Sequence, residues 1–269
     1  MAGRGLDVEG WIAREGALSR VPAAFAGVVD AARARIAESF DGGRLHSAYI
    51  YGSIPRGTAI LGVSDLDLLL ALRTEPTEAD RAAATRVEQD LDRSFPQIDG
   101  VGILLFSART LLSELERHDL GFFVACLCTP LLGGDDLADQ LPRYRPTPLL
   151  ARETNGDLSL ALPGWRRQAV EANTDQQRKT LSRVVARRIV RTGSTLIMPR
   201  WGGWTSDLTQ SAEAFGLHYP ERAEQMRRAA VIGRTPSPVP SVLRELIDGL
   251  GPWLAAEYAV VHGEKAVRP

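Results

Sequence analysis

The chain has 269 residues, of which 44% are hydrophobic and 24% are charged, a composition typical of one large or two modest folded domains and not of a disordered chain. Its 32 Lys and Arg residues nearly balance 33 Asp and Glu residues, for a formal net charge of −1, which excludes a uniformly basic nucleic-acid-binding surface but not a local basic face. No apolar run approaches the roughly 18 residues that span a bilayer, no secretory-signal core follows the N-terminus, and two cysteines are too few for a disulfide framework, so we expect a cytoplasmic protein.

The first half of the chain predicts alternating helices and strands. The continuous apolar half of the strand at 65–72 indicates a central, buried position in a sheet. Thr77 is placed to cap the helix that follows this strand. Strands alternating with helices predict an α/β or α+β domain. The expected helices cover residues 23–40, 78–95 and 108–128, and the expected strands cover 47–51, 65–72 and 97–106.

The second half of the chain predicts helices alone. Prolines and an Asn-Gly pair punctuate residues 141–163, a pattern typical of a linker or crossover. The expected helices cover residues 165–198, 207–215, 220–231 and 241–262, which together predict a bundle of four or five helices. We therefore expect two domains, residues 1–145 and residues 146–269.

The residues best suited to chemistry lie at the start of the second expected strand and just after the first. Asp65 and Asp67 are two positions apart on a strand, so both carboxylates project from one face of the sheet. Their mutual repulsion is relieved by a divalent cation, and Mg²⁺ prefers few carboxylates together with phosphate oxygens. Upstream, Gly52 allows a ligand to approach the backbone, and the Ser53 hydroxyl and nearby N–H groups can hold phosphate oxygens. The pattern predicts a site for a nucleoside triphosphate with Mg²⁺.

A Gly-Ser pair, eleven intervening residues and Asp-x-Asp on a hydrophobic strand resemble the signature of the polymerase-β-like nucleotidyltransferase superfamily. The resemblance extends over residues 45–106, and its Gly-Ser-x-x-Arg-Gly variant is common in small bacterial members. Residues 122–136 are loosely similar to the end of the catalytic domain. The helical second domain is similar in architecture to streptomycin/spectinomycin adenylyltransferases. The resemblance implies an α/β (α+β) nucleotidyltransferase domain with a small mixed sheet, followed by an all-α helical bundle that binds substrate or nucleotide.

The resemblance also implies a mechanism. Mg²⁺ held by Asp65 and Asp67 bridges the triphosphate, Ser53 and the loop N–H groups hold its β and γ phosphates, and an acceptor hydroxyl attacks the α-phosphorus as pyrophosphate leaves. Such sites usually have a third carboxylate that binds metal or accepts the proton of the acceptor. Asp99 is the candidate for this metal-binding and catalytic role, although an aspartate before a glycine is also typical of a turn.

Three cations are further candidates for nucleotide binding. Arg56 could contact a phosphate or pair locally. Residues 165–200 carry nine positive and two negative side chains, and Lys179 and Arg183 recur on one helical face within that stretch. This basic face predicts contact with the triphosphate or with a polyanionic acceptor such as RNA; the alternative is a solvated face that balances acids elsewhere.

These observations lead to one leading hypothesis for the function and two rivals. The leading hypothesis is Mg²⁺-dependent transfer of AMP from ATP to a hydroxyl group of a small molecule such as an aminoglycoside. The second keeps the chemistry and changes the acceptor to RNA, including tRNA, or protein, as in nucleotidylating toxins. The third is a catalytically inactive nucleotide-binding module, which would be favoured if Asp99 lay far from Asp65 and Asp67.

Overall fold

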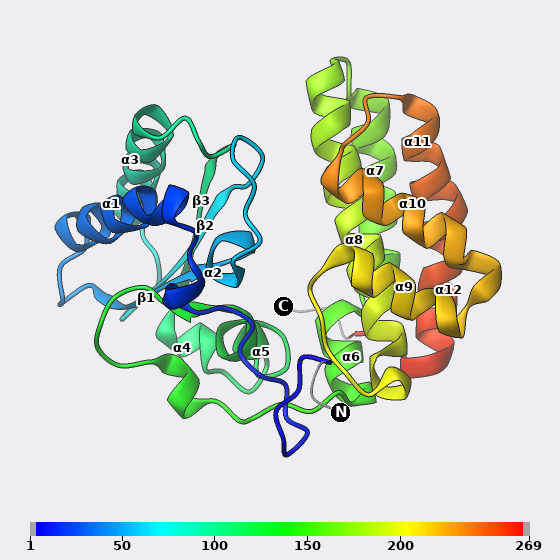
Figure 1. Ribbon diagram of the computed structural model, residues 1–269, viewed down its shortest axis with the longest axis horizontal. Helices are drawn as coiled ribbons and strands as arrows, with labels where there is room; N and C mark the ends of the chain where they lie inside the picture. The colour runs from blue at the N-terminus through cyan, green and yellow to red at the C-terminus, as the bar shows by residue number, and fades with distance from the viewer. Residues whose placement is uncertain (1–3, 266–269) are drawn as a thin grey trace. The chain divides into compact units, whose positions relative to one another are not determined.

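The computed structural model describes residues 4–265, which divide into two compact units (Figure 1). One unit, residues 13–144, holds a small mixed sheet with helices on both faces. The other contains residues 145–265 together with residues 4–12 and is built of helices. The predicted fold class, a small mixed-sheet domain followed by a helical bundle, is confirmed.

The N-terminal segment belongs with the helical unit, whereas the sequence placed it in the first domain. Backbone and side-chain contacts explain the difference. The backbone N–H of Trp204 donates to the carbonyl oxygen of Arg4 (2.8 Å). The Arg145 guanidinium lies 4.0 Å from the centre of the Trp11 ring, a favourable cation–π arrangement. These contacts join segments far apart in the sequence, so no local pattern could reveal them.

Within residues 13–144, four strands form one sheet in the order β3-β2-β1-β4. Strand β2 pairs in antiparallel fashion with β1 and in parallel with β3, and β1 pairs in antiparallel fashion with β4. The central position predicted for the second strand is therefore confirmed. The strands are β1 (Leu45–Tyr51), β2 (Leu66–Leu72), β3 (Val101–Ser107) and β4 (Thr129–Pro130).

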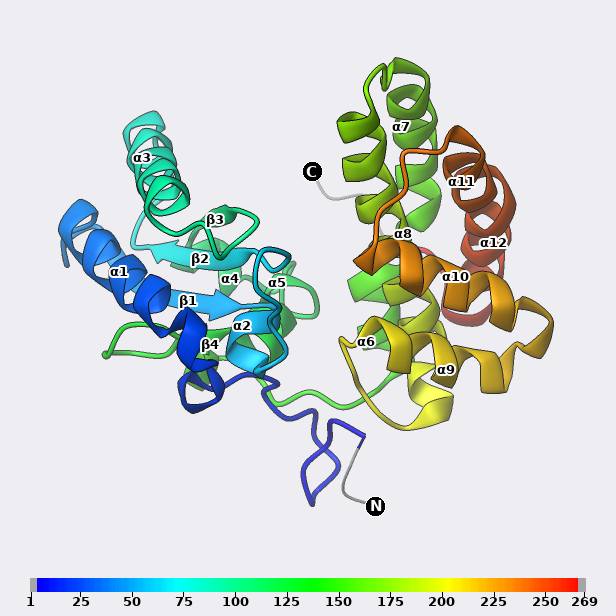
Figure 2. The same cartoon turned by 45° about the horizontal axis from the view of Figure 1, so that its top comes forward.

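Two long helices, α1 (Ala23–Ser39) and α3 (Glu78–Ser94), cover one face of the sheet, as Figure 1 and Figure 2 show. Leu66, Leu68 and Leu70 of β2 are buried in the core that this face shares with the two helices. The predicted cap of α3 is confirmed, because the Thr77 side chain accepts from the Asp80 N–H and the Asp80 side chain accepts from the Thr77 N–H.

Shorter helical segments cover the opposite face. The core on this side includes Leu69 and Ala71 of β2, which alternate with the leucines of the first face. The expected helix at 108–128 is interrupted by turns at 112–119. The segments are α4 (Ala108–Leu111), α5 (Leu120–Phe122) and a π-helical turn (Phe123–Leu127).

The helical unit departs from the sequence prediction in two places. Residues 148–163, expected to be part of a linker, are largely helical. Thr147 caps α6 (Pro148–Asn155), and Pro148 lies in its first turn, where proline is favourable. Pro163 lies inside α7 (Leu158–Glu171). The helix expected at 165–198 is two helices, since Thr174 forms a capping box with Gln177 that starts α8. The main helices are α6 (Pro148–Asn155), α7 (Leu158–Glu171), α8 (Asp175–Trp201), α9 (Leu208–His218), α10 (Ala223–Arg234), α11 (Pro240–Arg244) and α12 (Gly251–His262).

Two further properties bear on function. None of the helices within residues 4–265 has the length and apolar character needed to cross a membrane. Burial raises the pKa of the Cys126 thiol to about 12 and that of Cys128 well above its usual value. Both thiols are therefore protonated near neutral pH and serve as small core residues, not as nucleophiles.

Candidate functional site

The Gly-Ser loop turns the chain sharply at the end of β1. Gly52 has φ +84° and ψ −153°, a backbone conformation that is essentially restricted to glycine. The short helix α2 (Ser53–Arg56) begins at the next residue and ends at Gly57, which has φ +77°. The chain thus makes a strand–turn–helix transition at the Gly-Ser pair.

This loop lies against the second carboxylate of the Asp-x-Asp pair. Tyr51, the last residue of β1, is paired with Asp67 in the antiparallel register. A Cβ atom on Gly52 would lie only 2.5 Å from Oδ2 of Asp67, so the carboxylate would have to move to make room for it. The structure therefore brings the Gly-Ser loop and the carboxylate together, and it permits only glycine at the point of contact.

The two carboxylates occupy the start of β2. Asp67 shares its sheet face with Leu69 and Ala71, opposite to the leucines packed on α1 and α3. Asp65 precedes the strand by one residue and is two positions from Asp67, and both side chains are half-buried. The pleat of the strand therefore directs both toward the same face, as the sequence predicts.

Two glycines, Gly100 just before β3 and Gly102 within it, flank this pair. A Cβ on Gly100 would lie 4.0 Å from Oδ1 of Asp65. Gly102 is paired with Asp67 in the parallel register, and a Cβ there would meet no described atom within 4 Å. The strand beside the carboxylates therefore presents bare backbone and open space. The sequence reasoning missed these glycines as part of the site, although their spacing of two residues matches that of the aspartates.

Asp99 does not have the position predicted for a third carboxylate on the adjacent strand. It is exposed, lies in a bend before β3 begins at Val101, and its backbone N–H donates to the carbonyl of Ser64 (3.1 Å). Gly100, not Asp99, lies beside Asp65. Because neighbouring residues of an extended segment project to opposite faces, Asp99 does not share the sheet face of Asp65 and Asp67. Asp99 is therefore a bend residue in the structure, while its role as a third carboxylate stays a prediction.

A metal site at this position would consist of two protein carboxylates. Within residues 4–265 no three His, Cys, Asp or Glu side chains are grouped to hold a metal ion. Asp65 and Asp67 with the open space beside Gly102 still fit Mg²⁺, because that ion is commonly held by one or two carboxylates and completes its shell with phosphate oxygens and water.

Arg56 has partners within its own unit. Its Nε donates to the carbonyl oxygen of Gly52 (2.9 Å), and its Nη1 lies 3.8 Å from Oε2 of Glu15. This is the local pairing considered above for Arg56, and it closes the Gly-Ser loop on itself. Direct contact of Arg56 with a phosphate stays a prediction.

Lys179 and Arg183 lie on α8 of the helical unit, the first exposed and the second half-buried. Much of the positive charge around them is already engaged. At least five of the nine cations in residues 165–200 have partners within the unit: Arg166 with Asp248, Arg178 with Asp175, Arg187 with the Gly233 carbonyl, Arg188 with Asp157, and Arg200 with the Tyr219 hydroxyl. This pairing favours the balanced-face interpretation, while nucleotide contacts from Lys179 and Arg183 stay predictions.

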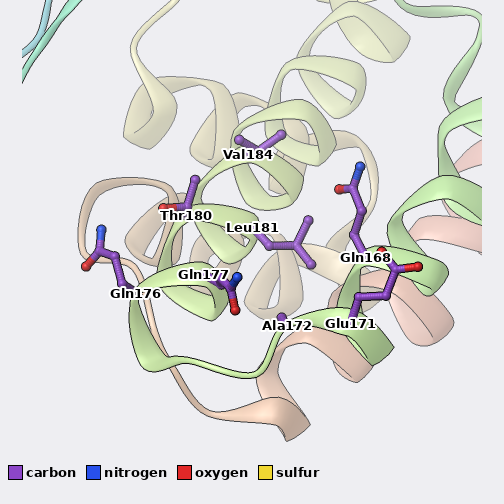
Figure 3. Close-up of a pocket in the computed structure, with 8 residues that line it drawn as sticks. All are labelled: Gln168, Glu171, Ala172, Gln176, Gln177, Thr180, Leu181 and Val184. Atoms are coloured by element: carbon purple, nitrogen blue, oxygen red, sulfur yellow. The ribbon is translucent and has the colours of Figure 1, made fainter.

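A pocket of about 390 Å³ lies between the end of α7 and the start of α8. Figure 3 shows the Leu181 side chain in its middle, with Gln168 and Glu171 on one side and Gln177 on the other. The pocket exists because the chain reverses between the two helices, and the sequence reasoning missed it because it expected one continuous helix there. Its full lining is Gln168, Glu171, Ala172, Gln176, Gln177, Thr180, Leu181 and Val184.

Comparison with known proteins identifies the class of fold. No family model and no curated protein matches the sequence. Among solved structures, the chain resembles spectinomycin adenyltransferase AAD(9) from Enterococcus faecialis, crystallised with ATP and spectinomycin. The match has a TM-score of 0.52 and 13% sequence identity, and it covers 86% of this chain and 98% of that chain. The protein therefore has a nucleotidyltransferase fold related to that of aminoglycoside adenylyltransferases, as its motif predicts.

Proposed function

We propose that the protein is a Mg²⁺-dependent nucleotidyltransferase that transfers AMP from ATP to a hydroxyl group of a small-molecule acceptor such as an aminoglycoside. The observation that carries the proposal is the contact between the Gly-Ser loop and the carboxylate pair. Gly52 approaches Asp67 so closely that a methyl group there would displace the carboxylate, which puts the loop backbone directly beside an acidic pair suited to Mg²⁺ and phosphate.

Each element of the site has a separate role in this proposal. Asp65 and Asp67 hold Mg²⁺, which when bound neutralises charge on the triphosphate and on the departing pyrophosphate. The Ser53 hydroxyl and the loop N–H groups bind phosphate oxygens. The open space beside Gly102 admits the nucleotide next to Asp67. The acceptor hydroxyl then attacks the α-phosphorus, and most of the rate arises from positioning and electrostatics.

The choice of nucleotide and acceptor is supported by the structural neighbour, which was crystallised with ATP and spectinomycin. An RNA acceptor is less favoured, because at least five of the nine cations in the basic stretch are engaged within the helical unit. One observation favours a second function, a nucleotide-binding module without transfer activity: within residues 4–265, the acidic pair is not joined by a third His, Cys, Asp or Glu.

The test is pyrophosphate release with Mg²⁺ and each of four nucleoside triphosphates, against aminoglycosides, spectinomycin and total tRNA. We expect release that requires ATP and a small acceptor, is lost in Asp67→Asn, and is unchanged in Asp92→Asn, a matched control on the exposed face of α3. Asp99→Asn should keep activity within a few fold, because Asp99 lies outside the acidic pair.

The other outcomes separate the rival functions. Release that depends on tRNA would assign a nucleic-acid acceptor. ATP binding that is measurable by calorimetry without release in any arm would indicate a binding module and would contradict transfer. Loss of activity in Asp99→Asn equal to that in Asp67→Asn would restore Asp99 as the third carboxylate.

A further inference from the structure

The segment at residues 13–17, named here the N-terminal strap, crosses between α2 and the π-helical turn. The backbone N–H of Ala17 donates to the carbonyl of Pro55 in α2 (2.9 Å), and that of Glu15 donates to the carbonyl of Cys126 (2.9 Å). The Arg14 side chain adds a hydrogen bond to the Ala125 carbonyl (3.2 Å). The strap is thus fixed by hydrogen bonds to the loop helix and to the opposite segment.

The strap also packs tightly at its centre. A Cβ on Gly16 would lie 2.4 Å from the Thr129 hydroxyl oxygen and 3.0 Å from Cβ of Pro55. Gly16 does not have a positive φ, so the need for glycine here is steric rather than conformational. A larger residue at position 16 would therefore have to displace Thr129 or Pro55.

Two successive side-chain contacts connect the strap to the Gly-Ser loop. Glu15 lies 3.8 Å from the Arg56 guanidinium, which in turn donates from Nε to the Gly52 carbonyl (2.9 Å). The side chains of Glu15 and Arg56 are only 14% and 26% exposed, so their attraction is screened less than that of a surface pair.

Holding the Gly52 carbonyl has a direct consequence for Ser53. A peptide unit is planar and trans, so the C=O of Gly52 and the N–H of Ser53 point in opposite directions. Fixing the carbonyl on Arg56 therefore directs the Ser53 N–H away from Arg56, and the peptide cannot rotate without breaking that hydrogen bond. The orientation of the Ser53 N–H group is thereby coupled to Arg56, at the end of α2, and through Arg56 to Glu15 in the strap.

We propose that Glu15 and Arg56 are positioning residues that orient the Gly52–Ser53 peptide of the phosphate loop, with Gly16 keeping the strap in place. This inference rests on the proposed function, because it names what holds the nucleotide-binding loop in its productive orientation. Arg56 acts through the peptide and does not itself bind the triphosphate. Glu15 acts through Arg56.

Glu15→Gln separates this role from direct phosphate binding by Arg56. If Arg56 positions the loop, removing the charge of Glu15 loosens Arg56 and weakens binding of Mg²⁺–ATP about tenfold, the effect of one hydrogen bond. If Arg56 binds phosphate directly, the same change frees Arg56 and leaves binding equal or tighter. Arg56→Ala should weaken Mg²⁺–ATP binding as much as Glu15→Gln does. The double variant should bind Mg²⁺–ATP about as tightly as either single variant, because Glu15 acts only through Arg56 and the two losses do not add.

The measurements are calorimetric titration with Mg²⁺–ATP and hydrogen–deuterium exchange of the peptide covering residues 52–58 without nucleotide. Glu38→Gln, an exposed change on α1, is the matched control and should alter neither. We expect faster exchange at the loop in both Glu15→Gln and Arg56→Ala, with cooperative thermal unfolding retained. Weakened binding in Arg56→Ala alone, or unchanged loop exchange in both variants, would overturn the proposal.

These readouts distinguish failure of the positioning role from failure of the proposed function. A wild-type protein that binds no nucleotide would overturn the function, while the exchange measurement would still decide whether the strap holds the loop. Gly16→Ala should speed loop exchange as well. Adding Thr129→Ala removes the 2.4 Å clash and should partly restore protection, because within the described residues the Thr129 hydroxyl is buried with no hydrogen-bond partner to lose.

Discussion

Replacing Gly52 with alanine tests the close approach of the loop to Asp67. The backbone at Gly52 has φ +84° and ψ −153°, a region that costs other residues about 1–3 kcal/mol. Alanine also restricts the unfolded chain, which offsets about 0.4–1 kcal/mol of this cost. We therefore expect Gly52→Ala to lower the free energy of unfolding by about 1–2 kcal/mol from the backbone alone. The clash of its Cβ with Oδ2 of Asp67, 2.5 Å away, adds to this loss and displaces the carboxylate.

Urea unfolding measures the loss in the free energy of unfolding caused by Gly52→Ala. Two further variants separate its backbone part from the part due to the clash with Asp67. Gly42→Ala is the matched control, because Gly42 is exposed, does not have a positive φ, and a Cβ there would meet no described atom within 4 Å. In an Asp67→Ala background the clash disappears, so Gly52→Ala should cost only its backbone part, and the difference is the coupling between the two sites. A midpoint for Gly52→Ala equal to that of Gly42→Ala would refute the reasoning.

Two other expectations follow from the same unit. Gly102→Val places a β-branched side chain on a strand in open space, so the free energy of unfolding should stay level or rise by up to about 1 kcal/mol. The same side chain should weaken Mg²⁺–ATP binding, because it fills the space beside Asp67. Unchanged binding by calorimetry would contradict the proposal that the nucleotide lies beside Asp67. The hydrogen bond from Arg44, aided by Thr77, holds the pKa of Asp80 well below its usual range, so the stabilisation by this carboxylate is fully present above about pH 4 and declines as the pH falls toward its folded pKa. Asp80→Asn should therefore cost about 1–3 kcal/mol at pH 7 and less at pH 3, and equal losses in urea unfolding at both pH values would show that the charge is unimportant.

Patterns confined to a few neighbouring residues could be interpreted from the sequence alone. The apolar run of β2 identified a central strand. Thr77 identified the start of α3, because a helix cap is a contact between residues only three positions apart in the sequence. The two-residue spacing of Asp65 and Asp67 placed them on one face through the pleat of the strand. The Gly-Ser and Asp-x-Asp motif also identified the class of fold, which the structural neighbour supports despite 13% identity.

Contacts between distant segments were decided only by the tertiary structure. The approach of Gly52 to Asp67 depends on the register of two antiparallel strands, and the exclusion of Asp99 from the acidic pair depends on where β3 begins. The link from Glu15 to Arg56 joins residues 41 positions apart; the Gly-Ser-x-x-Arg-Gly pattern singled out Arg56, but no local signal pointed to Glu15. Composition and periodicity report short-range preferences, whereas register, strand phase and partner choice are set by packing of the whole unit. The sequence alone thus predicted the fold class and the acidic pair, whereas only the tertiary structure decided the approach of Gly52 to Asp67 and the position of Asp99 before β3.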